Sequence, residues 1–211
     1  MSEILNVFDA GGAALDPPVA SIDDVHRLGL WHVTFACWLV SPRGTVLIQK
    51  RGARNRIDPG SYDASASGHL SAGETPEDGW RECREELGVV LPAEDRFPIG
   101  VLRNQAVRGD YINNEFCHVF LARWQGTGQD LTLQAGEVAG CAEMSVADGL
   151  ALFGGHRLEI SAQTTDGDIT LCATDMCNAA QRTGKNGYYL KVMEAAADLL
   201  AGRPLRTLPP L

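Results

Sequence analysis

Residues 68–89 constrain this chain more than any other segment, because a glycine-rich loop leads there into a helix with a stop signal at each end. Thr75 suits the N-cap position and Pro76 suits the first helical residue, where a missing N–H costs nothing. Gly88 suits the left-handed residue that ends a helix. The sequence therefore predicts a helix over residues 76–87 whose position along the chain is fixed at both ends.

Three glutamates of this helix are expected to face one side. Glu82, Glu85 and Glu86 are spaced i, i+3 and i+4, and residues at that spacing lie on one face. Like charges so placed repel one another, whereas carboxylates are the ligands that hard divalent cations prefer. The pattern favours a Mg²⁺ or Mn²⁺ site, with Arg81 placed to orient a carboxylate by a bidentate bond. A solvated acidic helix face is the alternative that the glutamates alone leave open.

Composition narrows the class of protein. The 211 residues include 27 acids and 18 bases, a formal net charge of −9, and 45% of them are hydrophobic. Such a chain folds, and it is a poor non-specific ligand for nucleic acid. No apolar run is long enough to span a membrane, the first residues do not resemble a signal peptide, and the six cysteines form no CxxC pair. We expect a soluble cytoplasmic protein with buried thiols that binds neither nucleic acid nor membranes.

The remaining pattern predicts a mixed α/β core over residues 1–154 and a C-terminal extension over residues 155–211. Strands are predicted at residues 4–7, 13–15, 32–40, 45–49, 99–107 and 115–124, the first four of them forming two hairpins, and helices at residues 146–153 and 188–200. After residue 155 the pattern weakens until the last helix. We expect the extension to pack on the core or on a second chain.

Basic residues gather at the end of the strand predicted for residues 45–49. Lys50 and Arg51 follow it directly, with Arg54 and Arg56 close behind. We predict that Lys50 and Arg51 bind the substrate at a phosphate-facing edge. A solvated strand end is the alternative.

The segment 68–89 resembles the signature of the Nudix hydrolases, Gly-x5-Glu-x7-Arg-Glu-U-x-Glu-Glu-x-Gly-U, in which U is an apolar residue. The matching positions are Gly68, Glu74, Arg81, Glu82, Cys83, Glu85, Glu86, Gly88 and Val89. Only six residues separate Glu74 from Arg81, where the family has seven. The missing residue leaves the Arg-Glu-x-x-Glu-Glu block intact and places the adjustment before Arg81, with Gly79 as the expected position. The role of Glu74 is therefore open.

This resemblance implies an α/β/α sandwich with a mixed sheet, in which the signature forms a loop–helix–loop. It implies that Glu82, Glu85 and Glu86 bind Mg²⁺ or Mn²⁺ together with the carbonyl of Gly68, and that Arg81 orients Glu82. Glu82, Glu85 and Arg81 are then the catalytic residues. The implied reaction is hydrolysis of a diphosphate linkage in a nucleoside diphosphate derivative or a related small organic diphosphate by metal-activated water. A homodimer is also implied.

Segments outside the signature resemble the isopentenyl-diphosphate isomerase branch of the family, namely residues 25–32, 49–51, 65–69 and 114–120. In true isomerases, histidines at the positions of His26, His32 and His69 bind a metal, and acids stand near the positions of Asn113 and Glu115. The catalytic cysteine of that branch is replaced here by Ser67. A serine hydroxyl is a far weaker acid than a thiol, so the resemblance favours an isomerase-like Nudix hydrolase. Whether the histidines bind metal or only form structural hydrogen bonds stays open.

Glu115, His69 and Glu74 are therefore candidates for an additional metal ligand or a catalytic base. The isopentenyl-diphosphate isomerase is the first alternative function. The second is a Nudix module that binds a nucleotide without turnover. The intact carboxylate block argues against the second alternative, because a site without chemistry has no reason to retain mutually repelling acids.

Overall fold

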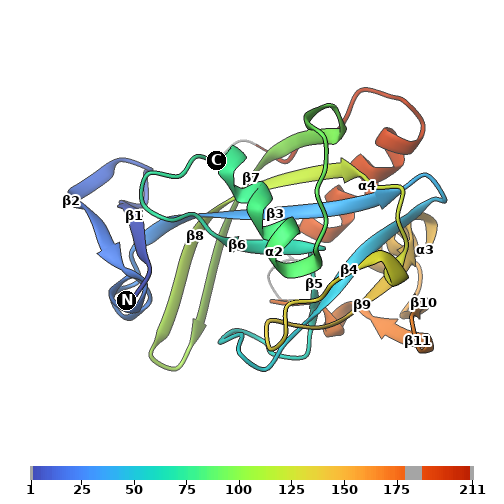
Figure 1. Cartoon of the computed structure of the whole chain (residues 1–211), viewed down its shortest axis with the longest axis horizontal. Helices are drawn as coiled ribbons and strands as arrows, with labels where there is room; N and C mark the ends of the chain where they lie inside the picture. The colour runs from blue at the N-terminus through green and yellow to red at the C-terminus, as the bar shows by residue number, and fades with distance from the viewer. Residues whose placement is uncertain (1, 179–186, 210–211) are drawn as a thin grey trace.

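The computed structural model describes residues 2–178 and 187–209 (Figure 1). Its strands are β1 Ile4–Phe8, β2 Ala14–Ser21, β3 Trp31–Ser41, β4 Thr45–Arg51, β5 Tyr62–Asp63, β6 Ala66–His69, β7 Arg96–Arg108, β8 Tyr111–Arg123, β9 Val138–Ser145, β10 Glu159–Thr164 and β11 Gly167–Cys172. Its α-helices are α1 Ile22–Leu28, α2 Arg81–Leu87, α3 Val146–Phe153 and α4 Tyr188–Leu200. Short 3₁₀ helices lie at Pro76–Trp80, Ala93–Asp95, Gly128–Asp130 and Ala173–Asp175.

Strand β3 is the centre of a large and mostly antiparallel sheet. It pairs in parallel with β8, from Trp31 opposite Asn114 to Val40 opposite Arg123. Its antiparallel neighbours are β1, β4 and β6. The pairing with β4 is confined to the turn, after which β4 diverges and pairs with β9. The two predicted hairpins and the α/β class are confirmed.

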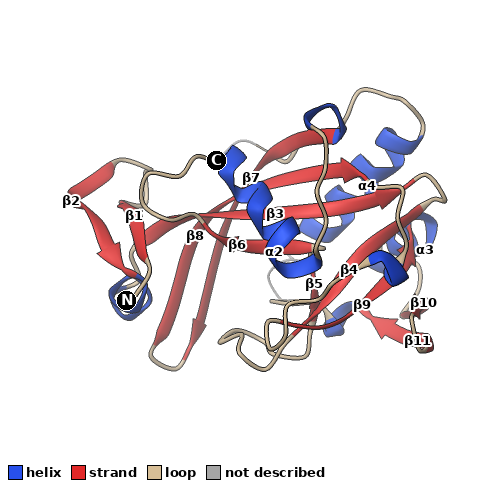
Figure 2. Cartoon of the chain, viewed as in Figure 1, coloured by secondary structure: helices blue, strands red, loops and turns tan. Residues whose placement is uncertain are grey.

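Helices cover both faces of this sheet (Figure 2). Successive side chains of a strand point to opposite sides, so β3 presents one set of apolar residues to each face. On one face Phe35, Cys37 and Leu39 of β3 belong to a cluster of buried residues with Cys83 and Leu87 of α2. On the other face the alternate residues of β3 join a second cluster that includes α4. Each apolar face is thereby removed from water, which is the main stabilising term of such a fold.

The helix predicted over residues 76–87 is divided. Its first turn, Pro76–Trp80, is a 3₁₀ helix with Thr75 and Asp78 as a capping box, and the α-helix starts at Arg81. Gly79 lies against Phe35 so closely that a side chain there would overlap the aromatic ring. The C-terminal stop is as predicted, since Gly88 has a left-handed conformation.

The region after residue 154 holds a hairpin, β10–β11, where no regular element was predicted. Its pattern is weak because only Ile160 and Ala162 of β10 are buried between exposed polar residues. Helix α4 is present as predicted. The domain boundary at residue 154 and the homodimer stay predictions. Within the described residues, no helix has the length and apolar character needed to cross a membrane.

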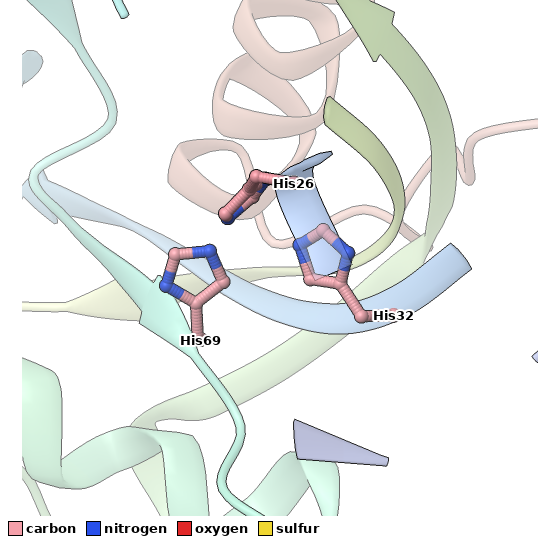
Figure 3. Close-up of side chains that lie close together, drawn as sticks. All are labelled: His26, His32 and His69. Atoms are coloured by element: carbon pink, nitrogen blue, oxygen red, sulfur yellow. The ribbon is translucent and has the colours of Figure 1, made fainter. Parts of the chain in front are cut away.

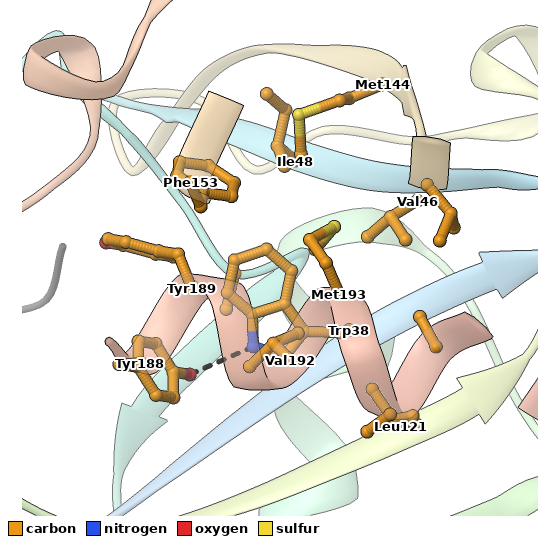
Figure 4. Close-up of a cluster of buried hydrophobic side chains, with 14 of the residues drawn as sticks. Trp38, Val46, Ile48, Leu121, Met144, Phe153, Tyr188, Tyr189, Val192 and Met193 are labelled. Carbon is orange, nitrogen blue, oxygen red and sulfur yellow. Dashed lines mark hydrogen bonds between the residues drawn. The ribbon is translucent and has the colours of Figure 1, made fainter. Parts of the chain in front are cut away.

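Trp38 connects β3 to α4 in the interior of the second cluster (Figure 4). The indole is fully buried, and its Nε1–H donates to the hydroxyl of Tyr188 over 2.9 Å. The ring also packs edge-on against Tyr189. The C-terminal helix is therefore attached to the central strand by both apolar and polar contacts.

We expect Tyr188→Phe to lower the free energy of unfolding by roughly 1–3 kcal/mol, because it leaves a buried indole N–H without its acceptor. Urea denaturation followed by tryptophan fluorescence measures the change. The same substitution in a Trp38→Phe background should cost clearly less, since no indole N–H remains to be satisfied. Equal costs in both backgrounds would contradict the role assigned to this hydrogen bond.

Candidate functional site

A cavity of about 460 Å³ lies between α2, β6 and the β7–β8 hairpin. Its walls contain most of the residues predicted from the sequence, namely Arg51, Gly68, His69, Arg81, Glu82, Glu85, Glu86 and Glu115. The sheet thus brings Glu115 to the signature helix from about thirty residues further along the chain. We describe the carboxylate side of this cavity first and its histidine side afterwards.

Helix α2 lies directly against β6 at Gly68. A Cβ atom at this position would overlap the carboxylate of Glu82, so only glycine permits the contact. Burial raises the pKa of Glu82 to about 7, although Arg81 acts in the opposite direction. The glycine of the signature therefore makes room for a carboxylate. The predicted role of the Gly68 carbonyl as a metal ligand stays a prediction.

Glu86 lies one turn further along the same face of α2. Its Oε2 accepts hydrogen bonds from the side-chain amide of Gln49 and from the backbone N–H of Ser67, each over 2.9 Å. Burial raises the pKa of Glu86 to about 8. Glu82 and Glu86 are both buried, whereas the side chain of Glu85 is 44% exposed at the end of the cluster.

Arg81 holds this carboxylate cluster together. Its guanidinium forms a bidentate pair with Glu74, over 2.8 and 3.0 Å, and donates to Glu82 over 2.6 Å. It also donates to Glu85 over 3.2 Å and to the backbone carbonyl of His69 over 2.8 Å. The pair with Arg81 lowers the pKa of Glu74. Glu74 does not line the cavity, and its carboxylate is the bidentate partner of Arg81.

The carboxylate cluster fits a divalent cation on the chemistry of its donors. Burying a carboxylate is costly unless a positive charge compensates it. Arg81 contacts Glu82 but makes no described contact with Glu86. A hard cation held by Glu82, Glu85 and Glu86 would supply the missing charge.

Three histidine rings converge on the other side of β6 (Figure 3). His26 comes from α1, His32 from β3 and His69 from β6, and their ligand nitrogens all lie within 4.8 Å of one another. Burial is the main cause that lowers the pKa of each ring, that of His26 to about 4. The rings are therefore neutral at physiological pH, which is the form that binds metals.

The hydrogen bonds of two of these rings determine which nitrogen faces the cluster. The Nδ1–H of His32 donates to the carbonyl of Leu30 over 3.2 Å, and its Nε2 is buried with no hydrogen-bond partner among the described residues. The Nδ1–H of His26 donates to Ile112, and its Nε2 accepts from the hydroxyl of Tyr111 over 2.8 Å. A carbonyl on Nδ1 with a partnerless Nε2 is typical of a metal ligand.

Glu115 lies beside this histidine cluster. It is buried, lines the cavity and is the direct cross-strand neighbour of His32. The side-chain amide of Asn104 donates to its Oε1. Glu115 can therefore act toward a cation at the histidines or toward a ligand in the cavity.

The two predicted substrate-binding bases separate. Arg51 lines the cavity, where it lies 3.5 Å from Asp63 and donates to the carbonyl of Ile57 over 3.0 Å. Lys50 does not line the cavity, because neighbouring residues of a strand point to opposite faces. Its ammonium instead lies 5.9 Å from the ring centre of Tyr62.

Sequence reasoning missed three acids of the cavity wall, one of which is Asp63, the partner of Arg51. The other two are Glu3, which precedes β1, and Glu137, which precedes β9. Burial raises the pKa of Glu3. Neither residue stands at a recognisable spacing from the signature, so no pattern in the sequence connected them to it.

Comparisons with known proteins show the family to which this chain is similar. Residues 30–161 match the NUDIX domain family. An uncharacterised Nudix hydrolase of Clostridium acetobutylicum is 33% identical over 160 residues, which cover 74% of this chain and 76% of that protein. The isopentenyl-diphosphate Delta-isomerase of Shigella flexneri is 38% identical over 96 residues, which cover 44% of this chain and about half (52%) of the isomerase.

A solved structure shows the same fold. The crystal structure of DR0079 from Deinococcus radiodurans superposes with a TM-score of 0.56 at 20% identity. The match covers 72% of this chain and 90% of that one.

We expect Gly68→Ala to weaken binding of Mn²⁺ at the carboxylate cluster by roughly tenfold or more, because the added methyl group displaces Glu82. Electron paramagnetic resonance of free Mn²⁺ measures the affinity. Gly140→Ala is the matched control, since a Cβ there meets nothing within 4 Å. Equal Mn²⁺ affinity in Gly68→Ala and the wild type would show that this contact does not position the ligand.

Proposed function

The chain belongs to the Nudix family, and from this membership we propose that it is a Mg²⁺- or Mn²⁺-dependent hydrolase that cleaves the diphosphate linkage of a small organic diphosphate. One observation carries the proposal. Arg81 is hydrogen-bonded to Glu82 and Glu85, and Glu86 lies on the same helix, so that all four residues line one wall of a cavity large enough for such a substrate. The three layers made by α2, the sheet and α4 also agree with the α/β/α sandwich that the resemblance implies.

Each residue of the cluster has a role that follows from its contacts. Glu82 and Glu86 would hold the cation at the buried side, and the more exposed Glu85 would complete the set beside the substrate. Arg81 fixes the carboxylate of Glu82 by a 2.6 Å bond. A cation bound there supplies charge neutralisation of the diphosphate and lowers the pKa of an attacking water. Arg51 supplies positive charge on the cavity wall for the anionic substrate.

A second cation site follows from the histidine side of the cavity. We infer that His26, His32 and His69 bind a metal ion with Glu115, as the resemblance to the isomerase branch implies. The buried Nε2 of His32 supports this assignment, since no described residue satisfies it. The hydroxyl of Tyr111 must then leave the Nε2 of His26 when that ring becomes a ligand.

The same histidine cluster is the specific observation that favours the isomerase as the second candidate function. Ser67 weighs against it. A serine hydroxyl does not readily replace a thiol in moving a proton at carbon.

We expect Glu85→Gln to reduce hydrolysis by roughly a hundredfold or more, because the variant keeps the shape of the side chain but removes one charge from the cation site. The assay follows nucleoside di- and triphosphates, ADP-ribose, nucleotide sugars and isopentenyl diphosphate by ³¹P NMR with Mg²⁺ or Mn²⁺. Reaction in ¹⁸O-labelled water identifies the phosphorus that water attacks. Glu94→Gln, an exposed acid of the 3₁₀ helix Ala93–Asp95, is the matched control.

Three outcomes separate the candidate functions. Cleavage that Glu85→Gln abolishes and Glu94→Gln retains supports the hydrolase. Conversion of isopentenyl diphosphate without cleavage supports the isomerase. Binding of a nucleotide with no turnover in the wild type supports the non-catalytic module and contradicts the proposal.

A further inference from the structure

A row of buried polar side chains crosses three neighbouring strands on the histidine side of the cavity. His32 of β3 lies opposite Glu115 of β8, and Glu115 lies opposite Asn104 of β7. Directly opposed residues of paired strands point to the same face of the sheet. A histidine ring, a carboxylate and an amide therefore lie side by side across β3, β8 and β7.

Asn178, from the C-terminal part of the chain, continues this row. Its side-chain Nδ2 donates to Oδ1 of Asn104 over 3.0 Å. The Nδ2 of Asn104 in turn donates to Oε1 of Glu115. All three side chains are at least 93% buried, with relative exposures of 4%, 3% and 7%.

The direction of this hydrogen-bond chain matters. A side-chain amide has an acceptor at one end and a donor at the other, so the two ends cannot exchange roles without reversing the amide. Because Asn178 donates to the oxygen of Asn104, the amino group of Asn104 faces Glu115. The reversed amide would place a carbonyl oxygen against a carboxylate, which is repulsive in a buried environment.

Asn178 is itself held in place by its backbone. Its φ is 52°, a left-handed conformation that asparagine tolerates better than most residues. Its N–H donates over 2.8 Å to Oδ2 of Asp58. Asp58 is paired with Arg108 of β7 over 3.2 Å. Asn178, the first donor in this series of hydrogen bonds, is therefore held in place independently of Asn104.

We propose that Asn178 is a positioning residue that acts through Asn104 to orient Glu115 toward the cation held by the histidine cluster. The proposal rests on the second cation site put forward above. It gives the C-terminal part of the chain a defined role in the cavity. Asn178 fixes the orientation of the Asn104 amide. That amide in turn donates to Oε1 of Glu115 and so fixes the orientation of the carboxylate.

Co²⁺ tests the proposal, because its visible absorption reports the number and type of its ligands. In the wild type we expect a Co²⁺ spectrum that is lost in His32→Ala. In Asn178→Gly, which removes the amide but allows the left-handed backbone, we expect Co²⁺ affinity to fall by roughly tenfold or more and the spectrum to change. Tyr188→Phe is the control for a general loss of stability near the C-terminus, and it should bind Co²⁺ as the wild type does.

A double-mutant cycle tests the route through Asn104. Asn104→Ala should weaken Co²⁺ binding at least as much as Asn178→Gly does. Adding Asn178→Gly to Asn104→Ala should then have no further effect on the Co²⁺ affinity, since the Asn104 amide through which Asn178 acts on Glu115 is already absent.

The results that would overturn the proposal differ from those that would overturn the site. If the wild type gives no histidine-dependent Co²⁺ spectrum, the second cation site is wrong and the role of Asn178 fails with it. If that spectrum is present and Asn178→Gly binds Co²⁺ with unchanged affinity, only the role of Asn178 is wrong. Additive losses in the double variant would show that Asn178 does not act through Asn104.

Discussion

The arrangement of the cavity depends on one close contact, the approach of the Glu82 carboxylate to the backbone of Gly68. Two hydrogen bonds beside this contact also join α2 to β6. The N–H of Ser67 reaches Glu86 on one side, and the carbonyl of His69 accepts from Arg81 on the other. A side chain at position 68 would displace the carboxylate of Glu82 from its place between these two bonds. The glycine is thus a requirement of packing as well as a position in a motif.

Strand β6 serves as a common wall for two sites of different chemistry. Its backbone binds Glu86 and Arg81 of α2, while the ring of His69 turns toward His26 and His32. The carboxylates suit hard cations and the neutral imidazoles suit softer ones. Two cation sites would also offset the charge of an acidic chain, which is −9 overall, where the proposed anionic substrate would bind.

The sequence predicted what local spacing determines. The three glutamates, the end of their helix at Gly88 and the hairpins follow from patterns within about ten residues, and the structure contains the predicted helix end and hairpins. The features that depend on packing between distant segments could not be predicted from the sequence. The contact of Gly79 with Phe35 accompanies a first turn that is 3₁₀ rather than α. Glu3 and Glu137 reach the cavity only through the order of the strands, and the side of β4 on which Lys50 lies depends on the pairing of that strand.

The C-terminal part of the chain cannot be considered apart from the core. The cluster around Trp38 contains residues from both sides of position 154, including Met144 and Val146 before it and Val192 and Met193 after it. The stabilisation from apolar burial depends on both surfaces that meet. The residues before and after position 154 therefore stabilise this face of the sheet together. The C-terminal part also contacts the cavity wall, because Asn178 donates a hydrogen bond to Asn104. The histidine side of the cavity is therefore linked to the C-terminal part of the chain through Asn178, whereas α2 packs against the opposite face of β3.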